Sequence, residues 1–164
     1  MEHFNAASAE ALEQTLLSCL RSPRWSRRVA EHRPYPDLNS LLAAADEAAY
    51  DLTWPDLTEA LAAESLPPLP PDTYSAAHTA LSAAHAAYEA RFGHVFVICL
   101  EGVPQSECLD HLLEGIRSRL TNDPEEERVV VAEELRRLAR ARLVSTLRGA
   151  GNCATSHTQP APGR

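Results

Sequence analysis

The chain has 164 residues, a length that suits one domain able to bury about two thirds of its unfolded surface. Hydrophobic residues make up 45% of it, and much of that share is alanine, the strongest helix former, so a core of packed helices is expected without disulfides. The net charge of −8 excludes nucleic acid as a partner, and no apolar run approaches the roughly 20 residues that span a membrane.

The first part of the chain carries four helical patterns. Ser8 suits the N-cap of the first, because its hydroxyl can accept a hydrogen bond from a first-turn amide. Pro23 suits the first turn of the second, and Asp37 opens the third. The four predicted helices cover 9–20, 23 to about 29, 38–50 and 54 to about 63.

The middle of the chain alternates between residues that exclude a helix and residues that favour one. The stretch 66–71 holds four prolines in six positions and is predicted to be a loop within the domain. An alanine-rich helix is expected over 73–91, and Gly93 ends it. The run 95–100 is rich in β-branched residues, but a lone strand has no partner here, so we expect a buried extended segment.

Two further helices are predicted in the C-terminal part, over 105–120 and 125 to about 147. The last one has acidic residues at its start and arginines at its end, which complements the helix dipole. The polar segment 149–164 is rich in glycine and proline, and we expect a disordered tail. The sequence therefore predicts an all-α, single-domain bundle of about seven helices over residues 1–148.

The cysteines and the N-terminus bear on the protein's environment. The four cysteines stand far apart with no C-x-x-C spacing, so neither a zinc site nor a disulfide framework is expected. Cys19, Cys99 and Cys108 have apolar neighbours and are interpreted as buried free thiols. The N-terminal residues lack a basic segment followed by an apolar one, which leads us to expect a cytoplasmic protein.

Five stretches, in the same order along the chain, resemble the 2-oxo-4-hydroxy-4-carboxy-5-ureidoimidazoline (OHCU) decarboxylase family. The resemblance extends from about Phe4 to Leu147. The stretches are Phe4-Asn5, Arg24-Trp25 with Arg33-Pro34-Tyr35, Tyr88-Glu89-Ala90-Arg91-Phe92-Gly93 with the run 95–99, the segment 119–125, and the segment 137–143.

The resemblance implies an all-helical enzyme that needs no cofactor and no metal. Members of the family remove a carboxylate from a heterocyclic intermediate between urate and allantoin, so a small anionic heterocycle is the implied substrate. They often form homodimers, although nothing in this chain identifies an interface.

The chain departs from the family where its catalytic residues are expected. The family's histidine lies in a His-Pro-x-Ile-Gly motif after the fourth helix, and Glu64 stands at the corresponding position. A serine followed by a Glu-Gln pair normally contacts the substrate, and the nearest match is Ser75-Ala76-Ala77-His78. The arginine expected after Gly102 is Val103, whereas Arg142 is retained.

Glu64 and His78 are the candidate catalytic residues. An ionised Glu64 would repel a substrate carboxylate, whereas burial would favour its protonated form and make it a proton donor. The alternative is a solvated glutamate at a helix end. His78 could supply the acid–base chemistry of the missing histidine, or it could be a surface imidazole. His78 and His85 share a helix face, but the further ligands of a metal site are missing.

Arg142 and the residues around Phe96 are the candidate substrate-binding residues. A guanidinium can hold a carboxylate with two parallel hydrogen bonds, although an arginine on an inner helix face is often part of a structural ion pair. By resemblance, Ser75 and the segment Phe96, Val97 and Ile98 would also line the pocket; otherwise the latter three are core residues.

Three functions are compatible with this sequence. The first is a decarboxylase of the family's own type, or one that acts on a related heterocycle. The second is a non-catalytic descendant that binds a small anion or a partner protein. The third is a structural subunit of a biosynthetic assembly. The retained Arg142 favours the first two.

Overall fold

The computed structural model describes residues 1–67 and 75–154 of the chain. Within these residues the regular secondary structure is helical and contains no β-strand, which confirms the predicted all-α class. The helices are α1 (Glu2–Ala6), α2 (Ala9–Cys19), α3 (Pro23–Glu31), α4 (Leu38–Tyr50), α5 (Trp54–Leu61), α6 (Ser75–Phe92), the 3-10 helix η1 (Gln105–Glu107), α7 (Cys108–Arg119) and α8 (Pro124–Ala154).

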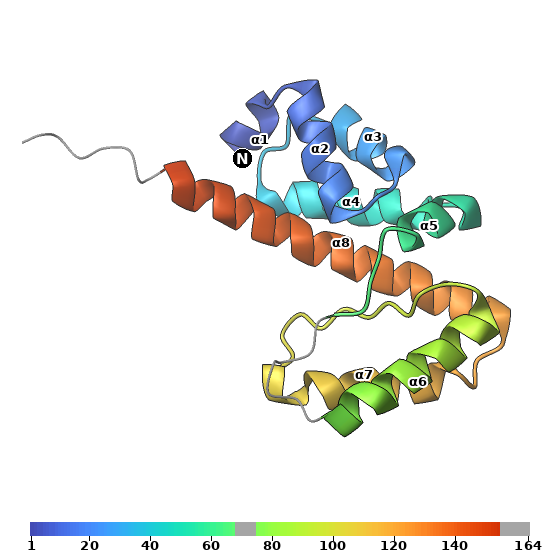
Figure 1. Ribbon diagram of the computed structural model, residues 1–164. Coiled ribbons are helices and arrows are strands. Elements are labelled where there is room, and N and C mark those ends of the chain that lie inside the picture. Colours follow the sequence, from blue (N-terminus) through green and yellow to red (C-terminus); the bar gives the residue numbers. More distant parts are fainter. Residues whose placement is uncertain (68–74, 155–164) are drawn as a thin grey trace, which may run out of the picture.

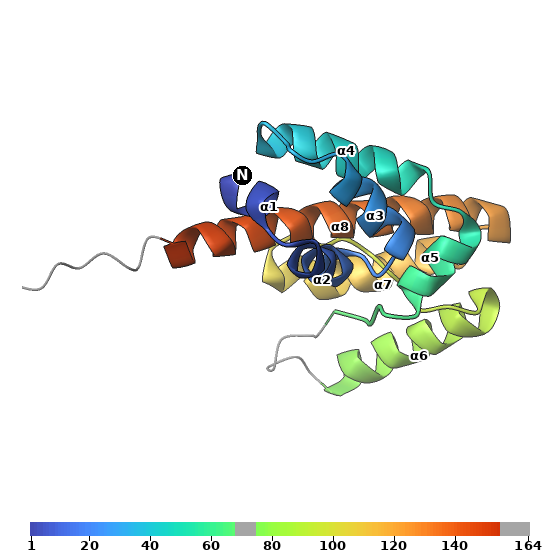
Figure 2. The ribbon, with the colours of Figure 1, turned by 90° about the horizontal axis from the view of Figure 1, so that it is seen from above.

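The long helix α8 organises the fold. Figure 1 shows α1–α5 on one side of α8 and the pair α6 and α7 on the other. Seen from above, α4 runs alongside α8 while α6 lies farther out (Figure 2). The chain passes from the first group to the second after α5, and the extended segment between α6 and η1 then runs back between α8 and the pair α6 and α7 (Figure 1). These two connections meet beside α8.

The predicted helix starts are confirmed by their capping contacts. The Ser8 side chain accepts from the amide of Ala11 at 3.2 Å, and the Asp37 carboxylate accepts from the amide of Ser40 at 2.8 Å. Pro23 occupies the first turn of α3, where its missing N–H is no loss. Each cap satisfies an amide that the helix itself leaves unpaired.

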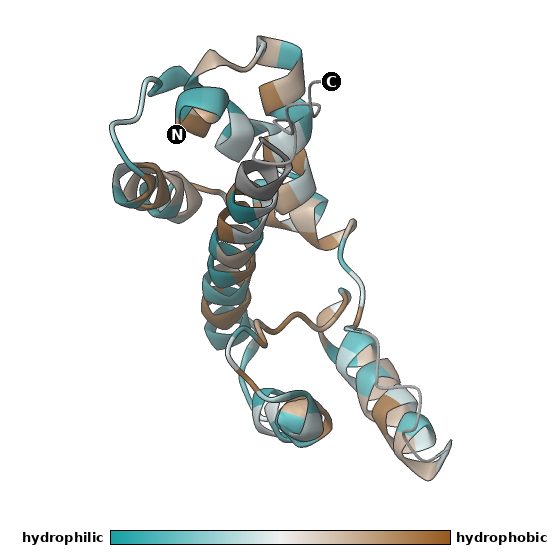
Figure 3. Ribbon diagram, turned by 90° about the vertical axis from the view of Figure 1, so that its left-hand side faces the viewer, coloured by the Kyte–Doolittle hydropathy of each residue, from teal (hydrophilic) through white to brown (hydrophobic). Residues whose placement is uncertain are grey.

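The core consists of two clusters of unequal size. The larger one joins α1–α5 to α8 and surrounds Trp25, whose indole N–H donates to the Ala45 carbonyl at 2.9 Å. The smaller one lies between α6, α7 and Phe96 and is built around Leu81, Tyr88 and Ile116. Figure 3 shows apolar residues gathered on the faces that the helices turn towards each other.

Several details differ from the sequence prediction. The five-residue α1 was not predicted, because so short a helix carries no periodic pattern; Phe4 anchors it in the core. Helix α8 continues to Ala154, so residues 149–154 of the expected tail are helical, and 155–164 lie outside the described residues. A glycine such as Gly149 weakens a helix by only about 1 kcal/mol, and proline is lacking over 125–154.

The buried face of α8 was also predicted with one error. The helical spacing of the sequence predicts one inner face made of Val129, Ala132, Leu135, Leu138, Ala139, Arg142 and Leu143. Val129 is 71% exposed instead, whereas Val131 is fully buried. Val131 lies one helical turn before Leu135, and that row continues through Ala139 and Leu143. The other residues predicted for the inner face of α8 are buried or half-buried.

Two findings concern the described residues as a whole. None of their helices combines the length and apolar character that crossing a membrane requires. Across 1–67 and 75–154, no three histidine, cysteine or acidic side chains come together as metal ligands would. Cys19 and Cys99 are buried free thiols as expected, but Cys108 is only half-buried.

A capping box at the start of α5 predicts a pH-dependent contribution to stability. The amide and the hydroxyl of Thr53 both donate to the Asp56 carboxylate, at 2.9 and 2.6 Å. The hydroxyl contact is the main reason why the pKa of Asp56 is lowered in the folded protein. A lowered pKa means that the contribution is present above the unfolded pKa and disappears as the pH falls through the folded one.

We therefore expect Asp56→Asn to lower the free energy of unfolding by about 1 kcal/mol at pH 7 and by almost nothing at pH 2. Urea denaturation followed by circular dichroism at both pH values measures this. Asp110→Asn, an exposed carboxylate in the first turn of α7, is the control and should change little. An equal loss at both pH values would contradict the role of the Asp56 charge.

Candidate functional site

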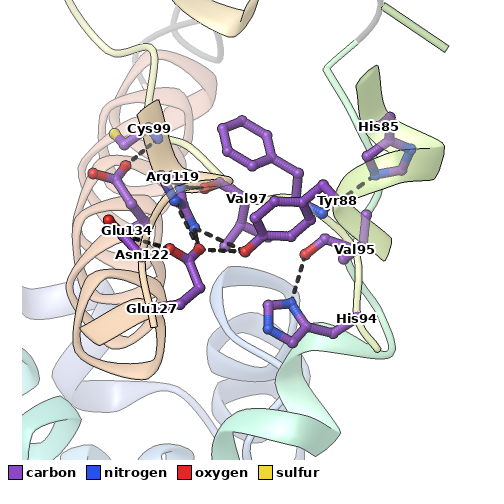
Figure 4. Close-up of polar contacts among 11 residues, drawn as sticks. His85, Tyr88, His94, Val95, Val97, Cys99, Arg119, Asn122, Glu127 and Glu134 are labelled. Carbon is purple, nitrogen blue, oxygen red and sulfur yellow. Dashed lines mark hydrogen bonds and ion pairs between the residues drawn. The ribbon is translucent and has the colours of Figure 1, made fainter. Parts of the chain in front are cut away.

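The extended segment between α6 and η1 is held in place by side chains instead of by a neighbouring strand. Gly93 ends α6 with a φ of 78°, a conformation that glycine adopts without strain, and the chain then runs back along α8. Figure 4 shows how its backbone groups are satisfied. Phe96 N–H donates to His85 Nε2 (3.2 Å), Arg119 Nη1 donates to the Val97 carbonyl (2.5 Å), and Cys99 N–H donates to Glu134 Oε2 (2.6 Å).

Helix α7 also packs closely against the extended segment between α6 and η1. A Cβ atom added at Gly115 would lie 3.2 Å from the Ile98 side chain and 3.3 Å from the ring of Phe96. An alanine at this position would require the Ile98 and Phe96 side chains to shift by a few tenths of an ångström. The segment is therefore fixed both by hydrogen bonds and by packing, as a wall must be if it is to shape a binding site.

A buried polar network stands behind the wall. Glu127 is 1% exposed, and its Oε1 accepts from Arg119 Nε and Nη2 at 2.8 and 2.6 Å and from the Tyr88 hydroxyl. Its other oxygen accepts from Asn122 Nδ2 at 2.8 Å. Burial, followed by the contact with Glu127, raises the pKa of Tyr88 and keeps the phenol protonated. The network connects α6, α7 and α8 through one carboxylate (Figure 4).

On its other side, the extended segment faces an open cleft of about 610 Å³. The cleft lies where the segment passes α2, α8 and the stretch that follows α5. Apolar side chains and a few charged groups line it together. The residues that matter here are Leu17, Arg21, Glu64, Leu66, Ile98, Cys99, Leu138 and Arg142.

An ion pair between Glu64 and Arg142 occupies the cleft. Arg142 Nη1 donates to Glu64 Oε1 and Nη2 to Oε2, both at 2.7 Å, so the guanidinium holds the carboxylate with two parallel hydrogen bonds. Nη1 also donates to the Cys19 carbonyl at 3.1 Å. The Glu64 side chain is 8% exposed and that of Arg142 is 37% exposed. The hydrogen bonds that Arg142 donates to Glu64 raise the pKa of Arg142, although partial burial opposes them.

This arrangement brings together three of the residues predicted from the sequence. Glu64, Ile98 and Arg142 all line the cleft. The solvated alternative for Glu64 is wrong, since its side chain is nearly buried and paired. Both alternatives for Arg142 remain open, because a guanidinium that binds Glu64 in a structural pair also has the geometry to bind a ligand carboxylate.

The other predicted residues lie elsewhere. Ser75 and His78 are exposed on α6 and do not line the cleft. Phe96 is fully buried in the smaller core cluster, and Val97 packs in the larger one and offers its carbonyl to Arg119. Side chains alternate along extended backbone, so Phe96 and Ile98 both turn towards α7 and Val97 turns to the larger cluster. Ile98 is only half-buried in that position, and it also lines the cleft.

Several residues of the cleft were not identified from the sequence. Leu17, near the end of α2, and Leu138, in the middle of α8, carry only the apolar spacing of a helix, which does not mark a cleft. Arg21 follows α2 without a motif, and Cys99 resembled any buried thiol. Only Cys99 carried a usable signal, because it belongs to the extended run beside Ile98.

A second, smaller cleft of about 310 Å³ adjoins the first through Cys99 and Glu101. Its arginines are already paired, since Asp46 accepts from Arg136 at 2.6 Å and from Arg140 at 2.7 Å. These contacts join α4 to α8. We interpret this second cleft as a structural ion-pair network.

Comparison with known proteins points to one family. A family model described as OHCU decarboxylase matches residues 5–66 and 69–144. No curated protein matches the chain. The predicted resemblance is thereby confirmed over most of the chain.

Two solved structures have a similar fold. One is a crystal structure of (S)-allantoin synthase, with a TM-score of 0.69 and 17% identity over 88% of this chain. The other is a crystal structure of OHCU decarboxylase in the presence of (S)-allantoin, with a TM-score of 0.68 and 19% identity over 87% of this chain. The chain spans 52% of the former and 99% of the latter. At these identities the likeness establishes the fold alone.

Proposed function

Because the chain belongs to the OHCU decarboxylase family, we propose that it removes a carboxylate from a small ureidoimidazoline-type heterocycle in the breakdown of urate to allantoin. One observation carries this proposal. Arg142 lies in a cleft of suitable size and already binds a carboxylate with both terminal nitrogens, at 2.7 Å each. A substrate carboxylate that takes the place of Glu64 would receive the same two hydrogen bonds.

The apolar residues of the cleft would hold the ring of the substrate. Leu66, Ile98 and Leu138 line the cleft beside the ion pair. Their contact with the ring excludes water from the bond that breaks and fixes the carboxylate against Arg142. A low-dielectric environment around a positioned charge is the condition under which electrostatic stabilisation of a transition state is strongest.

Glu64 would then supply the proton. Once the substrate has displaced it from Arg142, its nearly buried carboxylate has lost its cation, and in this mechanism it takes up a proton from the solvent. The bond between the ring carbon and the carboxylate breaks, the electron pair stays on carbon, and CO₂ leaves. The carbon takes the proton of Glu64, whose carboxylate returns to Arg142.

The ion pair also favours a second candidate function. A non-catalytic descendant that binds a small anion would keep Arg142 and the cleft while losing the acid–base residues. In that case Glu64 serves only to neutralise Arg142 when no ligand is bound. Both functions require the cleft to bind a carboxylated ligand, but only the decarboxylase converts that ligand into a product.

A turnover measurement decides between them. Urate oxidase generates the unstable intermediate in the cuvette, and the protein is added while circular dichroism follows the optical activity of allantoin. A decarboxylase should form one enantiomer in excess and faster than buffer. Glu64→Gln should abolish the excess, whereas His78→Ala, on the exposed face of α6, should leave it unchanged. Racemic allantoin at the buffer rate would eliminate the decarboxylase and leave the anion binder.

A further inference from the structure

We propose that Glu64 is a tethered competitor, which occupies the carboxylate subsite of the cleft and sets how tightly any carboxylated ligand can bind. The inference rests on the same cleft as the proposed function, but it concerns binding and holds whether or not turnover occurs.

The geometry of the pair is that of a bound ligand. Both Glu64 oxygens are engaged by the two terminal nitrogens of Arg142, at 2.7 Å each, and the carboxylate is almost fully shielded from water. Arg142 stays oriented by the Cys19 carbonyl at 3.1 Å, independently of Glu64. The guanidinium therefore remains a preformed carboxylate receptor when Glu64 leaves it.

The tether makes this competition strong. Glu64 follows α5 by three residues, so its carboxylate cannot diffuse away from Arg142, whose own helix α8 contacts α5. A group held by a short tether acts at an effective concentration on the order of millimolar or above. A free carboxylate without further contacts therefore binds poorly, and only a ligand with additional contacts displaces Glu64.

The surroundings of the pair indicate what such a ligand is. Leu17, Leu66, Ile98 and Leu138 line the cleft beside the guanidinium, so a flat ring attached to the carboxylate has apolar surface to contact. The fork of Arg142 fits two coplanar oxygens. The ligand class is therefore a planar heterocycle that carries one carboxylate, and the same heterocycle without the carboxylate gains nothing from the removal of Glu64.

Substitution of Glu64 tests the competition directly. Orotate, a carboxylated pyrimidine, is the probe, and uracil is the same ring without the carboxylate. We expect Glu64→Gln to bind orotate at least tenfold more tightly than the unaltered protein in isothermal titration calorimetry, since a neutral amide holds Arg142 less strongly than a carboxylate. Uracil binding should be equal in both proteins.

Two further variants separate the effect from other causes. Glu64→Ala should show the same gain, which excludes a new contact made by the glutamine amide. Glu125→Gln removes the acid of an exposed arginine pair elsewhere on α8, with Arg128 at 2.6 Å, and should bind orotate as the unaltered protein does. Arg142 is 37% exposed and stays hydrated without its partner, so both Glu64 variants should fold.

The results separate this inference from the proposed decarboxylation. Tighter binding of orotate by both Glu64 variants supports the tethered competitor even if no allantoin excess is ever observed. Equal orotate affinity with and without Glu64, or no detectable binding by any of these proteins, overturns it even if turnover is observed.

Discussion

Replacement of Arg119 with methionine is expected to lower the free energy of unfolding by about 3–5 kcal/mol, the usual result of removing one partner of a buried ion pair. Arg119 donates twice to Glu127, which is 1% exposed and cannot reach water without local unfolding. Without the guanidinium, the carboxylate keeps only two neutral partners, the Tyr88 hydroxyl and the Asn122 amide.

The substitution of Arg119 should also remove contacts other than those with Glu127. Arg119 also donates to the Val97 carbonyl, and its guanidinium lies 4.4 Å from the centre of the Phe96 ring. The hydrophobic residues of the smaller core cluster between α6 and α7 include none from α8. The network is thus the main connection of this helix pair to α8, and its loss should loosen the wall of the cleft.

Urea denaturation followed by circular dichroism measures the effect. Arg28→Met is the matched control, because Arg28 forms an exposed pair with Asp51 at 2.9 Å and such pairs contribute about 1 kcal/mol or less. The double variant Arg119→Met with Glu127→Leu should recover part of the loss, since it also removes the unpaired charge. A loss below about 1 kcal/mol for Arg119→Met would show that the network does not stabilise the fold.

If the proposed decarboxylation holds, replacement of Arg142 with leucine is expected to lower kcat/KM for the proposed ureidoimidazoline substrate by about 100- to 1000-fold. The variant removes two charge-assisted hydrogen bonds to the substrate carboxylate, which correspond together to about 3–4 kcal/mol. Arg142→Lys keeps the charge but loses the two parallel hydrogen bonds, so its activity should lie between that of the unaltered protein and that of Arg142→Leu. Stereoselective formation of allantoin, followed as above, measures all three proteins.

Two controls distinguish a lost contact from a lost fold. Arg142→Leu leaves the nearly buried Glu64 without its cation, so its free energy of unfolding should be compared with that of the double variant Arg142→Leu with Glu64→Gln, which carries no unpaired charge. Arg28→Leu, remote from the cleft, should keep full activity. Unchanged kcat/KM in a folded Arg142→Leu protein would rule out this arginine as the carboxylate receptor.

Much of the fold could be predicted because its signals are local. Ser8, Pro23 and Asp37 start helices through contacts with residues two or three positions away, and Gly93 ends one through its own backbone conformation. Such interactions depend on the neighbouring sequence alone. The exceptions, the short α1 and the exposed Val129, arise where helix length and rotation depend on what the helix packs against.

The candidate site could be predicted only in part. The resemblance identified Arg142, and the alignment of the stretch after α5 identified Glu64, but their sequence separation of 78 residues gave no indication that they form a pair. His78 carries an imidazole suited to acid–base chemistry, but it is exposed on α6. Leu81, about one helical turn further along, is buried, and the sequence gives no signal that separates the two positions.

By itself, the sequence determined that this chain folds into helices, where most of them begin and end, and which family it resembles. The tertiary structure alone decided that Arg142 meets Glu64 in a cleft, that Arg119 meets Glu127 behind its wall, and that His78 faces solvent. Helix formation follows from short-range hydrogen bonds and side-chain entropy, whereas ion pairs across helices depend on how distant segments pack, and no short-range pattern encodes that distance.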